Sequence, residues 1–86
     1  MVIWKFPLFV TDSLDLLMPE GAVILSVQNQ RDSLCLWAFC DPSAPLKSKK
    51  INIYGTGNPV PENPGRYIGT VQMDDGFLVW HVFQSP

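Results

Sequence analysis

Residues 22–40, AVILSVQNQRDSLCLWAFC, contain two apolar runs separated by a short polar segment. Residues 22–28 and 33–40 are rich in Val, Ile, Leu, Phe and Trp, which favour strands. The Asn and Asp residues between them are typical of a turn. The stretch therefore predicts a β-hairpin. Its second run is apolar at nearly every position, which indicates a central strand covered on both faces.

Alternation along the two runs predicts where their side chains point. Val23, Leu25 and Val27 should share one face, because successive strand side chains point to opposite faces. Cys35 and Cys40 are five positions apart, so on one strand they also face opposite ways and cannot form a disulfide with each other. We expect both to be small buried hydrophobic residues in a reducing compartment.

Strand-like runs continue outward from the hairpin, with turn residues about every eight to twelve positions. We expect Val2–Leu8 to be a strand that lies at an edge or ends at Pro7, because Pro7 cannot donate to a ladder. Residues 14–18 fit a short strand, with a capped helical turn as the alternative, and residues 49–54 fit another strand. The chain therefore predicts one all-β domain over residues 1–86, a small antiparallel barrel or sandwich of about six to seven strands.

Residues 66–83, RYIGTVQMDDGFLVWHVF, predict a second hairpin. Asp75-Gly76 favours a two-residue type I′ turn, because both central positions of that turn need positive φ. Counting outward from the turn places Thr70 opposite His81.

The same register places Gly69 opposite Val82. We expect Tyr67 to share the face that carries Trp80, since the two positions have matching parity in this register. A glycine within a strand allows a close neighbour, and we expect the Trp80 ring to lie over Gly69.

Composition and charge argue against several functions. The net charge of −2 opposes binding to nucleic acid through phosphate contacts. The only basic cluster, Lys47, Lys49 and Lys50, we interpret as a solvated strand edge. No apolar run has the length of a membrane span, and MVIWKFPLFV lacks the pattern of a signal peptide, so we expect a cytoplasmic protein. Because only 16% of the residues are charged, we expect some apolar surface to be covered, either by another copy in a homo-oligomer or by a partner.

Residues 55–65, GTGNPVPENPG, connect two predicted strands. They are not a phosphate-binding fingerprint, because the prolines prevent the helix that such a motif needs. They form either a stiff connection or a preorganised binding loop whose backbone N–H groups hold an anion. The candidate binding residues are Tyr54, Gly55, Thr56, Gly57, Asn58, Val60, Tyr67 and His81.

His81 is the only histidine in the chain. As a catalytic base it would need a nucleophile, such as Thr70, and an orienting acid from a loop. No spacing in the chain supports that triad, and the acids fall in or beside predicted turns. We therefore predict no enzyme, no catalytic residue, no metal site and no cofactor.

Three stretches taken together resemble a family of small uncharacterised proteins encoded by bacteriophages and prophage-bearing bacteria: MPEGAVILSVQNQRDSLCLWAFCDPSAP, YGTGNPVPENPGRYIGTVQ and GFLVWHVF. The resemblance covers about residues 2–83. It implies a compact accessory protein of phage type, acting in the host cytoplasm, and implies no activity. That family is expected to carry a histidine where this chain has Asn58.

We therefore expect a non-catalytic binding module that captures or inhibits a host factor stoichiometrically, such as a defence protein. The first alternative is sequestration of a nucleotide-like signal at a subunit interface, with residues 55–58 on its phosphate beside Lys49, Lys50 or Arg66. The second alternative is a structural virion accessory subunit.

Overall fold

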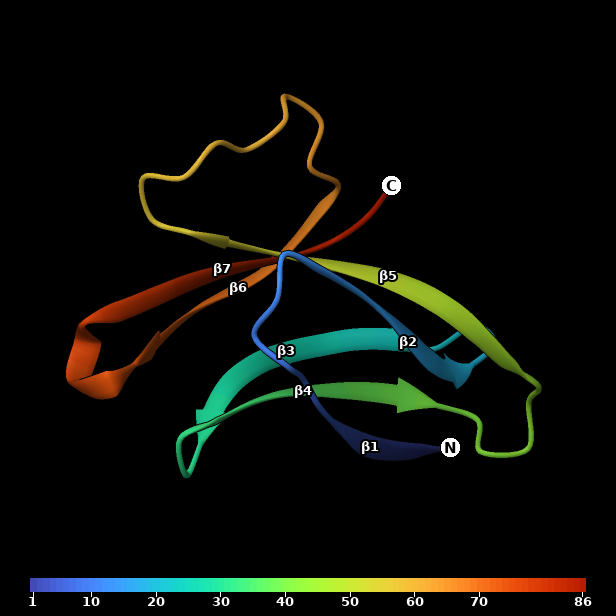
Figure 1. Ribbon diagram of the computed structural model, residues 1–86. Helices are drawn as coiled ribbons and strands as arrows, with labels where there is room; N and C mark the ends of the chain where they lie inside the picture. Colours follow the sequence, from blue (N-terminus) through green and yellow to red (C-terminus); the bar gives the residue numbers. More distant parts are fainter.

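The computed structural model describes residues 1–86 as two antiparallel sheets, packed face to face (Figure 1). The strands are β1 (Val2–Pro7), β2 (Ser13–Pro19), β3 (Val23–Gln30), β4 (Ser33–Cys40), β5 (Leu46–Gly55), β6 (Arg66–Met73) and β7 (Leu78–Gln84), and η1 (Asp74–Gly76) is a short 3-10 turn. One sheet has the order β1-β4-β3 and the other has the order β2-β5-β7-β6. The all-β prediction is confirmed, and the architecture is a sandwich and not a closed barrel.

Most predicted strands are present, with changes at their ends. Residues 14–18 lie within β2, so the helical-turn alternative is wrong. The N-terminal strand is an edge strand as predicted, and β4 is central in its sheet. The strand predicted at residues 49–54 begins earlier, at Leu46.

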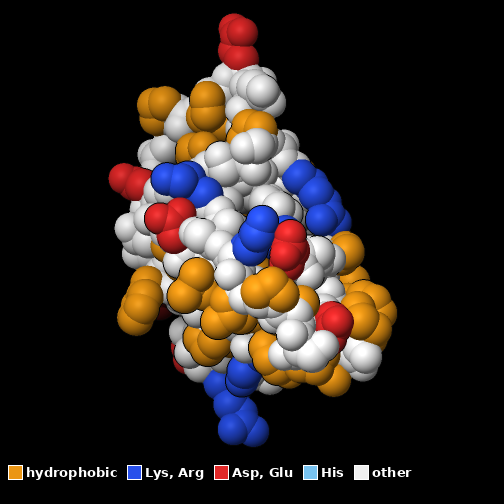
Figure 2. Space-filling model, turned by 90° about the vertical axis from the view of Figure 1, so that its right-hand side faces the viewer, with side chains coloured by type: hydrophobic (Ala, Val, Ile, Leu, Met, Phe, Trp, Pro, Cys, Tyr) orange, Lys and Arg blue, Asp and Glu red, His pale blue; other side chains and the backbone are white.

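Lys47 and Lys49 lie on the first half of β5, which pairs with β2 on one side only, because the ladder between β5 and β7 covers just Ile51–Gly55. The interpretation of the lysine cluster as a strand edge is therefore confirmed for this part of β5. Lys47 Nζ lies 3.3 Å from Glu20 Oε1, and Lys50 Nζ lies 4.0 Å from Asp15 Oδ1. On the face drawn in Figure 2, basic and acidic side chains lie among one another without a large patch of one sign. The positive charges of Lys47 and Lys50 thus lie near carboxylates of β2 and of the turn that follows it.

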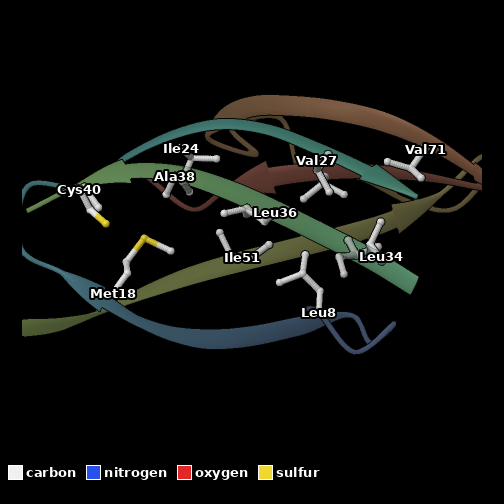
Figure 3. Close-up of a cluster of buried hydrophobic side chains, with 13 residues drawn as sticks. Leu8, Met18, Ile24, Val27, Leu34, Leu36, Ala38, Cys40, Ile51 and Val71 are labelled. Carbon is white, nitrogen blue, oxygen red and sulfur yellow. The ribbon is translucent and has the colours of Figure 1, made fainter. Parts of the chain in front are cut away.

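The core fills the space between the two sheets (Figure 3). From β4, alternate residues such as Leu36 point inward, and they belong to the same buried cluster as Ile51 of β5 and Met18 of β2. These three residues are completely buried. Burying an aliphatic side chain of this size contributes about 1.5–3 kcal/mol, so this apolar layer supplies the main stabilisation of the sandwich.

A β-bulge interrupts β3 between Ile24 and Ser26. Ile24 and Val27 are both buried in the core, whereas Val23 and Leu25 are exposed. The prediction that Val23, Leu25 and Val27 share a face is therefore wrong. The bulge adds one residue to the strand, so the alternation changes phase after it.

The two cysteines are both buried and free, as predicted. Cys40 belongs to the core cluster, and Cys35 lies on the other face of β4. The prediction that β4 is covered on both faces is wrong for the single chain, because Phe39 on the outer face is 41% exposed. The outer face of this central strand is apolar but only partly covered.

The turn between β6 and β7 has the predicted type I′ geometry. Asp75 and Gly76 have φ values of 52° and 86°. The backbone N–H of Phe77 donates to the carbonyl oxygen of Asp74 at 2.9 Å, which closes the turn. The ladder between β6 and β7 ends at the pair Met73 and Leu78, and the turn residues are not part of it.

Beyond this turn, the predicted register is confirmed, with Thr70 opposite His81. A β-bulge lies further along β6, between Tyr67 and Gly69, and Ile68 is the additional residue. Because of this bulge, Tyr67 points to the face that carries His81 while Ile68 packs against the core. The prediction that Tyr67 shares the face of Trp80 is wrong, since a bulge reverses the facing of every residue beyond it.

Gly69 of β6 lies against β3 of the other sheet. A Cβ atom added to Gly69 would lie 2.9 Å from Val27 Cγ1 of β3. The neighbour at this glycine is therefore Val27, and the prediction that Trp80 covers it is wrong. Trp80 instead lies against Gly55, with Cζ3 3.3 Å from the position of a Cβ atom there.

Two side chains link β3 and β6 on either side of this contact. Arg66 Nη2 donates to the carbonyl oxygen of Ile24 at 3.1 Å, and Asn29 Nδ2 donates to the carbonyl oxygen of Gln72 at 3.2 Å. Residue numbers increase in the same direction along both strands, so β3 and β6 run parallel here. This side of the sandwich is joined by side chains and packing, without a backbone ladder.

We expect Gly69→Ala to lower the free energy of unfolding by about 1–3 kcal/mol, because the added methyl group overpacks against Val27. Urea denaturation followed by tryptophan fluorescence measures this loss. In a Val27→Ala background the same substitution should cost clearly less, because the opposing methyl group is gone. An equal cost in both backgrounds would show that the Gly69–Val27 contact is not the cause.

Candidate functional site

His81 lies at the centre of the outer face of the four-stranded sheet. On β7 it is flanked by Tyr54 of β5 and Thr70 of β6. Its Nε2 atom lies 2.7 Å from Thr56 Oγ1, and its Nδ1 atom lies 3.0 Å from Thr70 Oγ1. Both ring nitrogens therefore have a hydroxyl partner.

Tyr67 extends this network by one residue. Its hydroxyl oxygen lies 2.6 Å from Thr70 Oγ1, so four side chains form a continuous chain from Tyr67 through Thr70 and His81 to Thr56. Each hydroxyl can donate and accept, which satisfies the imidazole in either tautomer. The bulge in β6 makes this possible, because it turns Tyr67 onto this face.

An aromatic group lies beside the network. The Phe83 ring is in edge contact with Tyr54, with centroids 5.7 Å apart, and with Tyr67, with centroids 5.5 Å apart. Edge-to-face pairs of this kind add about 0.5–1.5 kcal/mol beyond their burial. We call the surface formed by the two groups the His81 face; it consists of Tyr54, Thr56, Tyr67, Thr70, His81 and Phe83.

The connection from β5 to β6, residues 56–65, passes over this side of the sheet. It leaves the sheet at Gly55, opposite Trp80, and re-enters at Arg66, opposite Gln84. It therefore runs back along β7 to join two parallel strands. Figure 1 shows it on the side of the four-stranded sheet away from β1, β3 and β4, which is the side of the His81 face. Its three prolines restrict its backbone.

A hydrogen-bonded turn begins this connection. The N–H of Asn58 donates to the carbonyl oxygen of Gly55 at 3.0 Å, and Gly57 has a φ of 88°, which glycine adopts without strain. The N–H of Thr56 donates to the carbonyl oxygen of Val79 at 3.3 Å. Two of the amides expected to hold an anion are therefore already paired within the protein.

The two polar side chains of this turn point to different sides of the sheet. Thr56 reaches His81 on the outer face. Asn58 Nδ2 lies 2.8 Å from the position of a Cβ atom on Gly55, close to the Trp80 ring. Gly55 is thus required for packing, since a side chain there would displace Asn58 or Trp80.

Two hollows flank the turn, with volumes of about 240 Å³ and 310 Å³. Neither is lined by a lysine, an arginine or His81. The largest hollow, about 420 Å³, lies on the other sheet and includes Lys5 and Arg31. The centre of the His81 face is therefore an open surface, whereas Thr56 and Tyr54 at its margin each line one of the two hollows.

The structure gathers four of the predicted binding residues, Tyr54, Thr56, Tyr67 and His81, into this face. Gly55 and Gly57 shape the adjoining turn, Asn58 lies on its other side, and Val60 is exposed on the connection without a part in the network. Sequence reasoning did not name Thr70 or Phe83 as binding residues. The predicted pairing of Thr70 with His81 was a signal for the first, whereas no sequence signal indicated the second.

The network contains no carboxylate. The pKa of the Asp41 carboxyl is lowered, because the Ser43 hydroxyl and backbone N–H both donate to it, but this turn lies at the other end of β5. No group of three or more His, Cys, Asp or Glu side chains is arranged to hold a metal ion. The structure also has no helix with the length and hydropathy needed to cross a membrane.

The family model described as "Domain of unknown function (DUF7352)" matches residues 1–86. The chain belongs to this family. The expected membership of a family of unknown function is thus confirmed over the whole chain. No curated protein and no solved structure matches the chain.

We expect Thr56→Val in this DUF7352 chain to lower the free energy of unfolding by about 0.5–1.5 kcal/mol, because His81 Nε2 loses its hydroxyl partner. Amides of residues 56–65 should also exchange faster, since the start of the connection loses an anchor. Urea denaturation and hydrogen exchange measure these effects. Thr56→Ser keeps the hydroxyl and is the matched control; an equal loss in both variants would contradict a role for the hydrogen bond.

Proposed function

We propose that this protein is a non-catalytic binding module that captures a protein partner stoichiometrically through the His81 face. The observation that carries the proposal is the hydroxyl network, which holds both ring nitrogens of His81 on an open surface beside exposed Tyr67. A side chain fixed by its neighbours loses little entropy on binding, so this face is preorganised. Tyrosines held in this way are effective anchors in interfaces.

The same geometry gives little support to catalysis. A catalytic histidine needs a nucleophile to deprotonate and an acid that orients the ring. Hydroxyls lie within hydrogen-bond distance of both nitrogens of His81, but no carboxylate joins the network to orient the ring, and no hollow that could hold a substrate includes His81. The Thr70 hydroxyl also forms a hydrogen bond with the Tyr67 hydroxyl.

The resemblance to phage-encoded proteins supports a host factor as the partner, such as a defence protein in the host cytoplasm. A nucleotide-like ligand is less well supported, because the hollows beside the glycine turn contain no cation. Arg66 donates to the carbonyl oxygen of Ile24, and Lys50 lies near Asp15. Two of the three cationic groups expected to lie beside a phosphate are therefore engaged elsewhere.

Affinity capture from a bacterial host lysate, with mass spectrometry of proteins and small molecules, tests this proposal. Wild-type protein should retain a host protein in about a one-to-one ratio. Tyr67→Ala should retain at least about tenfold less, because a central aromatic anchor is lost. Leu17→Ala, a similarly exposed residue on β2 of the same sheet, should capture as the wild type does.

Two results would overturn the proposal. Equal capture by Tyr67→Ala and wild-type protein would show that the partner binds elsewhere. Recovery of a small molecule in place of a protein would favour sequestration. Circular dichroism of each variant should match the wild type, so that a loss of capture is not a loss of folding.

A further inference from the structure

The outer face of the three-stranded sheet carries a second exposed surface, on the opposite side of the sandwich from the His81 face. The register aligns Ile3 of β1, Phe39 of β4 and Val23 of β3 side by side. They are 58%, 41% and 48% exposed, and the bulge adds Leu25, which is 50% exposed. We call these four residues the apolar patch.

The patch is large for so small a chain. Four large apolar side chains, each about half exposed, together offer on the order of a few hundred Å² of apolar surface, about the size of the largest patch on a typical monomer. Monomeric proteins rarely expose more than a few hundred Å² in one patch. A standard interface buries about 800 Å² on each partner, of which about 60% is apolar. The patch therefore has the size of the apolar centre of one stable interface.

The sequence of β4 also indicates that this face is covered. Trp37 and Cys35 lie on the outer side of the strand together with Phe39, and no charged residue occurs in β4. Strands covered on both faces have this continuous apolar pattern. Within one chain, however, the outer side of β4 has no layer packed upon it.

We propose that a second copy of this chain covers the apolar patch, giving a two-fold dimer in which the three-stranded sheets pack face to face. Charge selects a second copy as the occupant. Ile3, Phe39 and Val23 form a row across the three strands. Lys5 lies on one side of this row, opposite Trp37, and Asp41 lies on the other side, directly after the end of β4. A two-fold axis at this row brings Lys5 of each copy toward Asp41 of the other, so the surface complements itself.

Sedimentation velocity between about 1 and 100 µM tests the dimer. The wild type should sediment with twice the chain mass of 9.7 kDa. Phe39→Lys should raise the dimer dissociation constant at least about 30-fold, because it places a charge at the centre of the interface. Leu25→Lys, on the bulge, should do the same and serves as a second variant in case Phe39→Lys fails to fold.

Leu17→Lys is the matched control, because Leu17 is 62% exposed on the other sheet and should leave the dimer intact. The proposal is overturned if the wild type stays monomeric at the highest concentration. It is also overturned if the wild type dimerises but Leu17→Lys disrupts the dimer and Phe39→Lys leaves it intact. Capture of the host protein uses the opposite face. It should survive in Phe39→Lys, so failure of the dimer and failure of the proposed function are separate results.

Discussion

The contact between Gly69 and Val27 determines where the two sheets meet and which side chains the four-stranded sheet presents to solvent. Only a residue without Cβ lets β6 approach β3 this closely. The bulge beside it adds Ile68, which packs against the core, and turns Tyr67 outward. Joining of the sheets and assembly of the His81 face are thus consequences of one irregularity in β6. Such bulges are functional features of a sheet more often than defects.

Local sequence signals were sufficient for the strands and for one complete hairpin. Turn residues and β-favouring runs located the strands, because both act within a few positions of the chain. Asp75-Gly76 specified the type I′ turn, and this turn fixed the pairing of Thr70 with His81. The proximity of Thr70 and His81, two of the four side chains in the hydroxyl network, was therefore predictable, since a turn sets the register of the strands that it joins.

Contacts between distant segments were not predictable in this way. Simple alternation misplaced Tyr67 and Val27, because no local signal marks the extra residue of either bulge. Trp80 was expected over Gly69, but which neighbour fills the space above a glycine depends on how the two sheets are arranged. The contact of Thr56 with His81 likewise depends on the path of the connection from β5 to β6, which starts opposite Trp80 and ends opposite Gln84 of β7.

The two exposed faces differ in chemistry, and this difference separates their roles. The His81 face mixes aromatic rings with hydroxyls already held by hydrogen bonds, which suits a partner that binds and leaves. The apolar patch has no comparable polar network, which suits permanent burial. The shortest dimension of the chain is 16 Å, so the two faces lie on opposite sides of a thin sandwich. Pairing through the patch therefore directs the two His81 faces away from each other. A single compact partner cannot reach both His81 faces of the dimer, so the dimer holds one partner on each side. It therefore gains no avidity for a monovalent target.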